Sequence, residues 1–244
     1  MKVVVTNNFA ESCQVVADMI TDVVNDNRQA NLGLATGRTA LSVYKPLIEN
    51  YNQGKVSFKD VHTINLDEYV GIDPENENSY RYEMNEALFQ HIDIDINNTY
   101  VPVGTNDTTQ EVATFKKKLE EHPIDFQLLG TGRNGHIGFN EPSDVALNAS
   151  VHIVKLDEKT IETNSQFFGG DLSRVPREAI TMGVGDILKA KKIALIVTGD
   201  EKLDATRALL TNDDVTTRVP CTLLKTHRDA TIVLDRDLYE KATK

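Results

Sequence analysis

The stretch LGLATGRTALSVYK, residues 32–45, indicates how this chain folds. Its first residues are apolar and are typical of a strand, a glycine follows at position 37, and a helical pattern opens near Thr39. A buried strand, a glycine turn and a helix in this order are typical of α/β proteins, in which a helix returns the chain to the next parallel strand. The stretch therefore predicts a mainly parallel sheet.

The same turn predicts an anion site. The backbone N–H groups and the positive end of the following helix point to one place, and Gly37 allows a ligand to approach the backbone. Thr36 and Thr39 add hydroxyl groups on either side. The stretch matches neither a Walker A loop nor the dinucleotide fingerprint, so a nucleotide is not implied. The alternative is an ordinary helix start at which Thr39 only closes the turn.

The rest of the chain alternates in the same way, and this predicts a parallel sheet covered on both faces in one domain spanning residues 1–244. Pro46 is expected to kink the second helix or to split off its first turn. Ligands of such sheets bind at the carboxyl ends of the strands. Strands are expected at 2–6, 31–36, 61–66, 124–129, 179–184, 193–198 and 231–235, and helices at 10–27, 39–53, 79–91, 108–121 and 201–211.

Composition excludes several classes of function. The net charge of −11 argues against binding to nucleic acid or to an anionic membrane, which both require a basic face. We find no apolar run near the ~18 residues of a membrane span, and the amino-terminal apolar stretch is too short for a signal peptide. The chain is therefore expected in the cytoplasm. Cys13 and Cys221 have no metal-type spacing and are expected to be core thiols.

Two acidic residues, Asp67 and Glu68, directly follow the strand expected at 61–66. If the strand continues, their side chains point to opposite faces, so one of them faces the cleft. A carboxylate at this position suits proton abstraction beside a carbonyl group. The alternative is a solvated acidic turn or a helix cap.

A glycine-rich histidine loop, LLGTGRNGHIGFNEP, occupies residues 128–142 after another apolar strand. Its glycines allow the backbone to come close to a ligand, and His136 suits proton transfer near neutral pH. Asn134, Glu141 or a backbone carbonyl could fix the tautomer of His136. No second histidine has ligand spacing, which argues against a catalytic metal, and Ser143 lacks a nucleophile elbow.

A last candidate is Lys202 in IALIVTGDEKLDAT, residues 193–206. It lies about one helical turn beyond a strand that ends in Thr198 and Gly199, so its charge could reach a phosphate. An ordinary surface lysine is the alternative. The remaining histidines have no comparable context and are expected to be structural or exposed.

Together these segments resemble the glucosamine-6-phosphate deaminase family. The matching pieces run in family order over nearly the whole chain, and GRNGHIGFNEP is the most specific of them. The resemblance implies a modified Rossmann-like three-layer α/β fold. It also implies conversion of an amino-sugar phosphate to a ketose phosphate and ammonia, with a small-molecule substrate and without a cofactor.

The resemblance also assigns roles. Asp67 matches the acceptor that moves a proton from C2 to C1, His136 the ring-opening base, and Glu141 its supporting acid, while Asn134 would orient His136. The residues that match phosphate contacts are Thr36, Gly37, Arg38, Thr39 and Lys202. Gln166 stands where many members have a phosphate-binding arginine. Either the phosphate is held less tightly or its contacts move to Arg38 or Lys202.

Two rival functions are weighed against the deaminase. One is 6-phosphogluconolactonase, a hydrolase of similar fold that needs no C2 proton shuttle. The other is a sugar-phosphate-binding regulator without catalysis, which should have replaced Asp67 or His136. The segments LDEYVG and GFNEP favour the deaminase.

Few cations that could form a second, regulatory phosphate site lie in residues 143–155. We therefore expect no strong allosteric activation, and we expect a monomer or small homo-oligomer.

Overall fold

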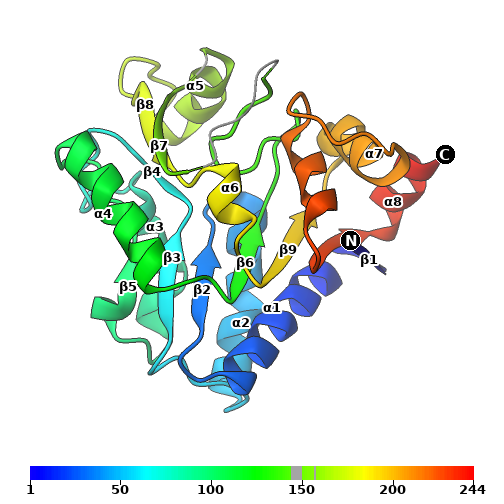
Figure 1. Cartoon of the computed structure of the whole chain (residues 1–244), viewed down its shortest axis with the longest axis horizontal. Coiled ribbons are helices and arrows are strands. Elements are labelled where there is room, and N and C mark those ends of the chain that lie inside the picture. Colours follow the sequence, from blue (N-terminus) through cyan, green and yellow to red (C-terminus); the bar gives the residue numbers. More distant parts are fainter. Residues whose placement is uncertain (144–149, 157) are drawn as a thin grey trace.

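The computed structural model describes residues 1–143, 150–156 and 158–244 of this chain. Within these ranges, seven strands form one sheet in the order β1-β10-β9-β6-β2-β3-β5, and all neighbouring pairs are parallel (Figure 1). The strands are β1 (Lys2–Thr6), β2 (Asn31–Leu34), β3 (His62–Asn65), β5 (Thr99–Tyr100), β6 (Phe126–Leu129), β9 (Lys192–Val197) and β10 (Ala230–Asp235).

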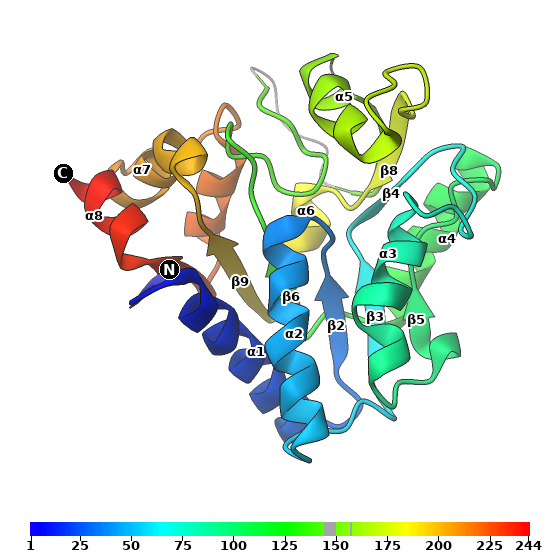
Figure 2. The ribbon, with the colours of Figure 1, turned by 180° about the vertical axis from the view of Figure 1, so that it is seen from behind.

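Helices cover both faces of this sheet, which gives the predicted three layers. Figure 2 shows the first three helices in front of one face, and Figure 1 shows α6 on the other, with α7 and α8 near β1. The helices are α1 (Phe9–Asp26), α2 (Arg38–Asn52), α3 (Tyr80–Ala87), α4 (Thr108–Glu121), α6 (Val184–Ile187), α7 (Leu203–Thr211) and α8 (Arg236–Thr243). Short 3-10 helices are η1 (Phe89–His91), η2 (Ile96–Asn98), η4 (Asp200–Lys202) and η5 (Pro220–Thr226).

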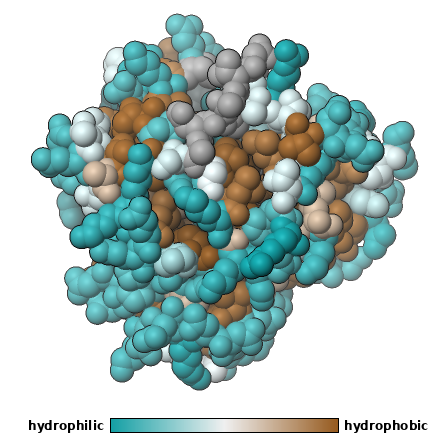
Figure 3. Space-filling view, viewed as in Figure 1, coloured by the Kyte–Doolittle hydropathy of each residue, from teal (hydrophilic) through white to brown (hydrophobic). Residues whose placement is uncertain are grey.

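The core lies between these layers. Strand β6 and the last five residues of β9 are buried throughout, as expected for parallel strands covered on both faces. Each buried large aliphatic side chain stabilises the fold by about 1.5–3 kcal/mol relative to its exposed state. Cys13 and Cys221 are both buried, which confirms them as core thiols. Hydrophilic side chains dominate the rim of the face in Figure 3.

A second, antiparallel sheet lies at the carboxyl ends of the main strands (Figure 1). It consists of β4 (Asp67–Tyr69), β8 (Glu178–Thr181) and β7 (His152–Lys155), and α5 (Glu158–Asn164) and η3 (Ser165–Phe168) lie above it. Side chains of this sheet and of the segments beside it form a small separate core that includes Tyr69, Phe139 and Phe168. This sheet places β4, and therefore Asp67, beside the main sheet.

Four expectations about the elements need correction. The strand expected at 179–184 ends at Thr181 and belongs to the small antiparallel sheet, because its partners are β4 and β7. Pro46 lies inside one unbroken helix, so the expected splitting of the first turn is wrong. The two other corrections concern helices that were expected to be continuous. The helix expected at 79–91 is α3 followed by the 3-10 helix η1, and the helix expected at 201–211 is the 3-10 helix η4 followed by α7.

Candidate active site

The predicted site residues come from four loops at one edge of the sheet. These loops follow β9, β6, β2 and β3, which are neighbours in that order. From β2 the chain moves outward to β3, and from β6 it moves outward to β9, so the direction of winding reverses between β6 and β2. Ligands of open α/β sheets bind at such a reversal.

The phosphate-type loop after β2 has the conformation that its sequence predicts. Gly37 adopts φ +87°, a region that side-chain-bearing residues rarely occupy, and α2 begins at the next residue. Gly37 caps this helix without a side-chain hydrogen bond, and the first N–H groups of a helix have no partner within the helix itself. The loop thus presents backbone donors to an anion.

Lys202 reaches this loop from the segment that follows β9. Its Nζ donates a hydrogen bond of 3.0 Å to Oγ1 of Thr39, and only 9% of the residue is exposed. Burial lowers the pKa of Lys202, the nearby Arg38 lowers it further, and Glu201 opposes the shift. Lys202 is therefore not the ordinary surface lysine of the alternative interpretation. Two cations that repel each other beside free backbone donors are what an anion site requires.

Asp67 lies at the start of β4 and is 7% exposed. Burial, together with the charges of Glu68 and Glu83, raises the pKa of its carboxyl to about 8. The alternative of a solvated acidic turn is therefore wrong. A carboxyl group that exchanges its proton near neutral pH is suited to general acid–base chemistry.

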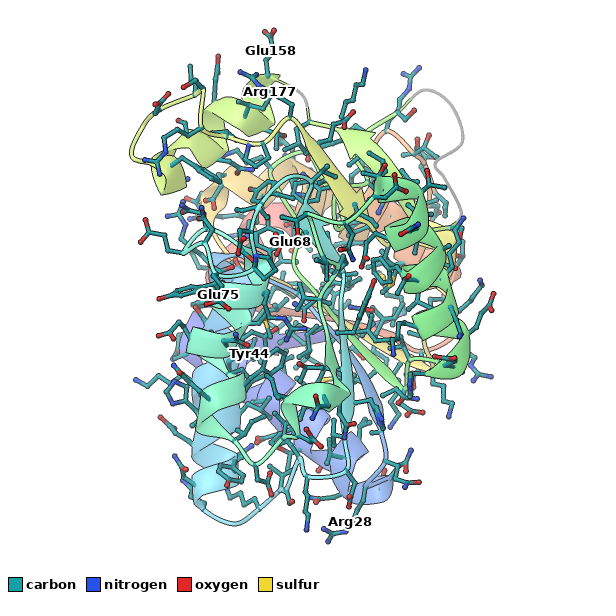
Figure 4. All side chains as sticks on the ribbon, turned by 90° about the vertical axis from the view of Figure 1, so that its left-hand side faces the viewer. Arg28, Tyr44, Glu68, Glu75, Glu158 and Arg177 are labelled. Carbon is teal, nitrogen blue, oxygen red and sulfur yellow. The ribbon has the colours of Figure 1, made fainter. Side chains whose placement is uncertain are left out.

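Glu68 points away from Asp67, as expected for adjacent residues of a strand. Its carboxylate accepts hydrogen bonds from Ser79 Oγ at 2.7 Å and from the backbone N–H of Arg81 at 3.1 Å. It also accepts one from the N–H of Tyr69 at 2.9 Å. Glu68 therefore ties β4 to the first turn of α3, and Figure 4 shows it at the upper end of the sheet.

The histidine loop comes directly beside Asp67. Gly138 adopts φ +56°, and a methyl group there would lie 3.4 Å from Oδ2 of Asp67 and 3.0 Å from Oγ1 of Thr181. Thr181 is the register partner of Asp67 and accepts a hydrogen bond from the N–H of Phe139 at 3.2 Å. The small sheet thus holds two predicted catalytic segments together.

His136 is supported mainly through Glu141. Nδ1 of His136 lies 3.3 Å from Oε1 of Glu141 but off the line of a hydrogen bond, a loose geometry that is common in ligand-free active sites. Oε2 of Glu141 accepts a hydrogen bond of 2.6 Å from Asn134. Burial raises the pKa of Glu141, but His136, Asn134 and Thr160 together lower it below its usual value.

Asn134 does not contact the imidazole in the predicted way. Its Oδ1 accepts a hydrogen bond from the backbone N–H of His136 at 3.2 Å, and its amide holds Glu141. The residue therefore positions the loop and the supporting acid. Gly132 is equally important, because a methyl group at this position would lie 2.2 Å from Cε1 of His136. Only a glycine leaves room for the ring.

Several residues that contact or influence the predicted site residues are only weakly indicated by the sequence. Thr181 and Thr160 lie in elements that the sequence pattern did not predict, namely β8 in its antiparallel setting and α5. The sequence could have indicated Glu83, because this charged residue falls on the inward-facing side of α3 between Tyr80 and Ala87, where an apolar residue is expected. Thr36 is half-buried beside the loop, whereas Arg38 and Gln166 have exposed side chains.

A cavity of about 470 Å³ lies elsewhere, and its lining includes Arg28, Tyr51 and Lys55. Figure 4 places Arg28 at the bottom end of the molecule, well below Glu68. All predicted site residues belong to the described part of the chain, and none of them lines this cavity. The chemistry of the four loops, and not the size of a cavity, therefore locates the candidate site.

Within the described ranges, no group of three or more His, Cys, Asp or Glu side chains is arranged to hold a metal ion. No helix of the described residues is long and apolar enough to cross a membrane.

Comparison with known proteins identifies relatives of this chain. A family model described as glucosamine-6-phosphate isomerases/6-phosphogluconolactonase matches residues 6–233. A glucosamine-6-phosphate deaminase of Clostridium perfringens is 45% identical over 97% of this chain and 98% of its own length. One from Geobacillus sp. is 44% identical over 97% of this chain and 94% of its own.

Solved structures agree in fold. A monomeric glucosamine-6-phosphate deaminase superposes with a TM-score of 0.93 at 36% identity, covering 99% of this chain and all of the other. A 6-phosphogluconolactonase of Thermotoga maritima superposes with a TM-score of 0.74 at 16% identity, covering 96% of this chain and 98% of its own, and shares the fold alone. The parallel sheet, the four loops and these matches show that the chain belongs to the glucosamine-6-phosphate isomerase/6-phosphogluconolactonase family.

Proposed function

We propose that this chain is a glucosamine-6-phosphate deaminase, which converts glucosamine 6-phosphate and water to fructose 6-phosphate and ammonia. The observation that carries the proposal is the buried Asp67 carboxyl, whose pKa is about 8, beside the backbone of the His136 loop. A carbon-bound proton next to a carbonyl group is removed by such a base. The relatives of 45% and 36% identity that are named as deaminases support the same activity.

Ring opening is the first step. His136, backed by Glu141, takes the proton of the anomeric hydroxyl and returns a proton to the ring oxygen as the C1–O bond of the ring breaks. The product is the open-chain aldehyde, with the phosphate held by Gly37, Arg38, Thr39 and Lys202. Each positioned acid–base group contributes roughly 10²–10⁴-fold to such a reaction.

Isomerisation and loss of ammonia follow. Asp67 removes the C2 proton to give an enolamine and then delivers a proton to C1, so the C2–N group becomes an iminium. Water adds to C2, and the resulting carbinolamine releases ammonia and leaves the ketose. Each step moves only protons, water and ammonia, so the chain's own acid–base groups suffice for the chemistry.

The lactonase alternative is less well supported. Hydrolysis of a lactone needs an activated water and a phosphate site, but it gives no role to a buried base positioned for proton exchange at carbon. Lactonases share the fold at 16–17% identity, which carries no information about the reaction. The regulator alternative is weakened because Asp67, His136 and Glu141 are all present, and Gly138 of the histidine loop lies beside Asp67.

The deciding experiment incubates the purified chain with glucosamine 6-phosphate or with 6-phosphogluconolactone. It measures ammonia and ketose phosphate in the first case and acid release in the second. We expect ammonia and ketose in equal amounts, without added metal or nucleotide and without an effect of EDTA. Rapid lactone hydrolysis without ammonia would reverse the assignment.

The setting of this activity is also a proposal. The substrate is a charged phosphate ester, which suits a single-domain cytoplasmic enzyme that does not bind nucleic acid or membranes. The solved deaminase that superposes with a TM-score of 0.93 is described as monomeric, which supports the proposal that this chain is a monomer or small homo-oligomer.

A further inference from the structure

The histidine loop and the small sheet that carries Asp67 are joined through side chains. Among the described residues, no backbone–backbone hydrogen bond links residues 131–142 to β4 or β8. Instead, the N–H of Phe139 donates a 3.2 Å hydrogen bond to Oγ1 of Thr181, and Nδ2 of Asn140 donates one of 2.9 Å to the carbonyl of Met182. The position of the loop against the sheet therefore depends on these contacts.

Asn140 uses both of its amide N–H groups. Nδ2 donates to the carbonyl of Met182 and, also at 2.9 Å, to the carbonyl of Ile137 within the loop. Only the NH₂ end of an amide carries two donors, so two carbonyl acceptors fix its orientation. Oδ1 of Asn140 has no hydrogen-bond partner among the described residues, and the residue is 2% exposed. The two donors are therefore the polar contacts that hold this side chain.

These contacts form a continuous route between the two proposed bases. The N–H of Met182 donates a 2.7 Å hydrogen bond to the carbonyl of Leu66, which directly precedes Asp67. The carbonyl of Met182 accepts from Asn140, whose amide also holds the residue that directly follows His136. The residues that make these hydrogen bonds are all buried, so a lost bond would leave an unsatisfied polar group in the interior.

The relative position of the two bases matters because they act on neighbouring atoms of one sugar. His136 acts at C1 and the ring oxygen, and Asp67 acts at C2 and C1. We propose that Asn140 is a positioning residue, which fastens the histidine loop to Met182 and thereby fixes the place of His136 relative to Asp67. The inference rests on the proposed function, which gives the two bases their roles. Asn140 itself is not a catalytic residue.

The test replaces Asn140 and measures steady-state kinetics. Asn140→Asp keeps the shape, but its carboxylate has no N–H to donate and faces two carbonyl oxygens, and Asn140→Ala removes the amide. A misplacement of about 1 Å can cost ~10²-fold in rate, so we expect kcat on the pyranose to fall by about 100-fold in both variants. KM should stay close to that of the parent, because the proposed phosphate contacts follow β2 and β9. Asn52→Asp, at the exposed end of α2, is the matched control.

The two forms of the substrate distinguish positioning from a loss of stability. Asp67 remains paired with Thr181 in the register of β4 and β8, whereas His136 loses its tie to the sheet. The Asn140 variants should therefore lose less activity on the open-chain form than on the pyranose, and their binding of inorganic phosphate by calorimetry should match the parent. A variant that is merely less stable would lose the same fraction of activity on both forms, and this result would count against the inference.

The ring signals of the histidines in the NMR spectrum of the ligand-free chain give a readout that needs no turnover. The signals of His136 should move in both Asn140 variants. Those of the buried His227, whose Nε2 lies 2.7 Å from the carbonyl of Ala190, should stay in place. If neither variant folds, Thr181→Val removes the acceptor of the other hydrogen bond between loop and sheet, and it should change kcat and the His136 signals in the same direction.

The outcomes separate this inference from the proposed function. Full turnover and unmoved His136 signals in folded Asn140 variants would overturn the inference and leave the deaminase assignment intact. No ammonia from the parent, together with moved His136 signals in the variants, would reject the proposed function and retain the role of Asn140 in placing the loop.

Discussion

Lys202 and Thr39 are 163 residues apart in the chain, and the Nζ of the first donates a 3.0 Å hydrogen bond to the hydroxyl of the second. The contact joins the loops after β9 and β2, which flank β6 in the sheet. It therefore closes one side of the proposed phosphate site and links the two elements that supply its charge and its backbone donors.

Lys202→Ala and Thr39→Val should raise KM with little loss of kcat. Removing one charged hydrogen bond to phosphate costs roughly 1.5–3 kcal/mol, or about 10–150-fold in affinity. Lys192→Ala, at an exposed position on the same strand–loop unit, is the control. Steady-state kinetics with glucosamine 6-phosphate and with free glucosamine give the measurement. Equal use of both sugars by the parent would show that the loop does not bind phosphate.

Asp67→Asn should abolish most turnover while leaving substrate binding near normal. The amide has nearly the same size but cannot accept the C2 proton, so kcat should fall by about 2–4 orders of magnitude. The base must be ionised, and its pKa is about 8, so kcat/KM of the parent should rise with pH up to that region. Asp73→Asn, an exposed neighbour, is the control. Turnover within a few-fold of the parent would assign the base to another group.

The same substitution should stabilise the fold at alkaline pH. The folded-state pKa of Asp67 is raised from 3.8 to about 8, so between these values the folded chain binds a proton that the unfolded chain has released. Its contribution to stability therefore falls as pH rises through this window. Asp67→Asn should gain about 2–5 kcal/mol over the parent at the alkaline end and almost nothing at the acidic end. Denaturant unfolding at several pH values tests this, and a constant difference would contradict it.

His136→Gln should impair the closed pyranose more than a substrate supplied in the open-chain form, because His136 is proposed to open the ring. Gly132→Ala should give the same pattern although it leaves the imidazole group itself unchanged. The new methyl group would lie 2.2 Å from the ring and would force the ring out of its position. At Gly130 an added methyl group meets no atom within 4 Å, so Gly130→Ala is the control. Comparable losses on both substrate forms would refute this division of labour.

N-acetylglucosamine 6-phosphate should not activate the enzyme strongly. A second phosphate site needs several donors, and residues 143–155 supply only His152 and Lys155 as cations. Residues 144–149 lie outside the described part of the chain. Velocity curves with and without the acetylated sugar should both be hyperbolic, and light scattering should give a monomer or small oligomer. A sigmoidal curve that the effector makes hyperbolic, from a hexamer-sized particle, would refute the prediction.

The sequence by itself determined the layers and predicted the place of the candidate site. Continuous apolar strands alternating with helical patterns can be buried only in a parallel sheet with covered faces, and the glycine at position 37 marks a turn that is independent of distant residues. Asp67, His136 and Lys202 were recognisable because each follows a strand. Local spacing along the chain was sufficient for these conclusions.

Tertiary structure decided the rest, because burial and contacts between distant segments are not visible in local spacing. The antiparallel sheet forms when β8 pairs with β4 and β7, and this pairing brings Asp67 beside Gly138. The burial of Lys202 and the raised pKa of Asp67 both depend on which neighbours displace water. A carboxyl group's proton affinity is set by that environment, so only the folded chain reveals which acidic residue is suited to act as a base.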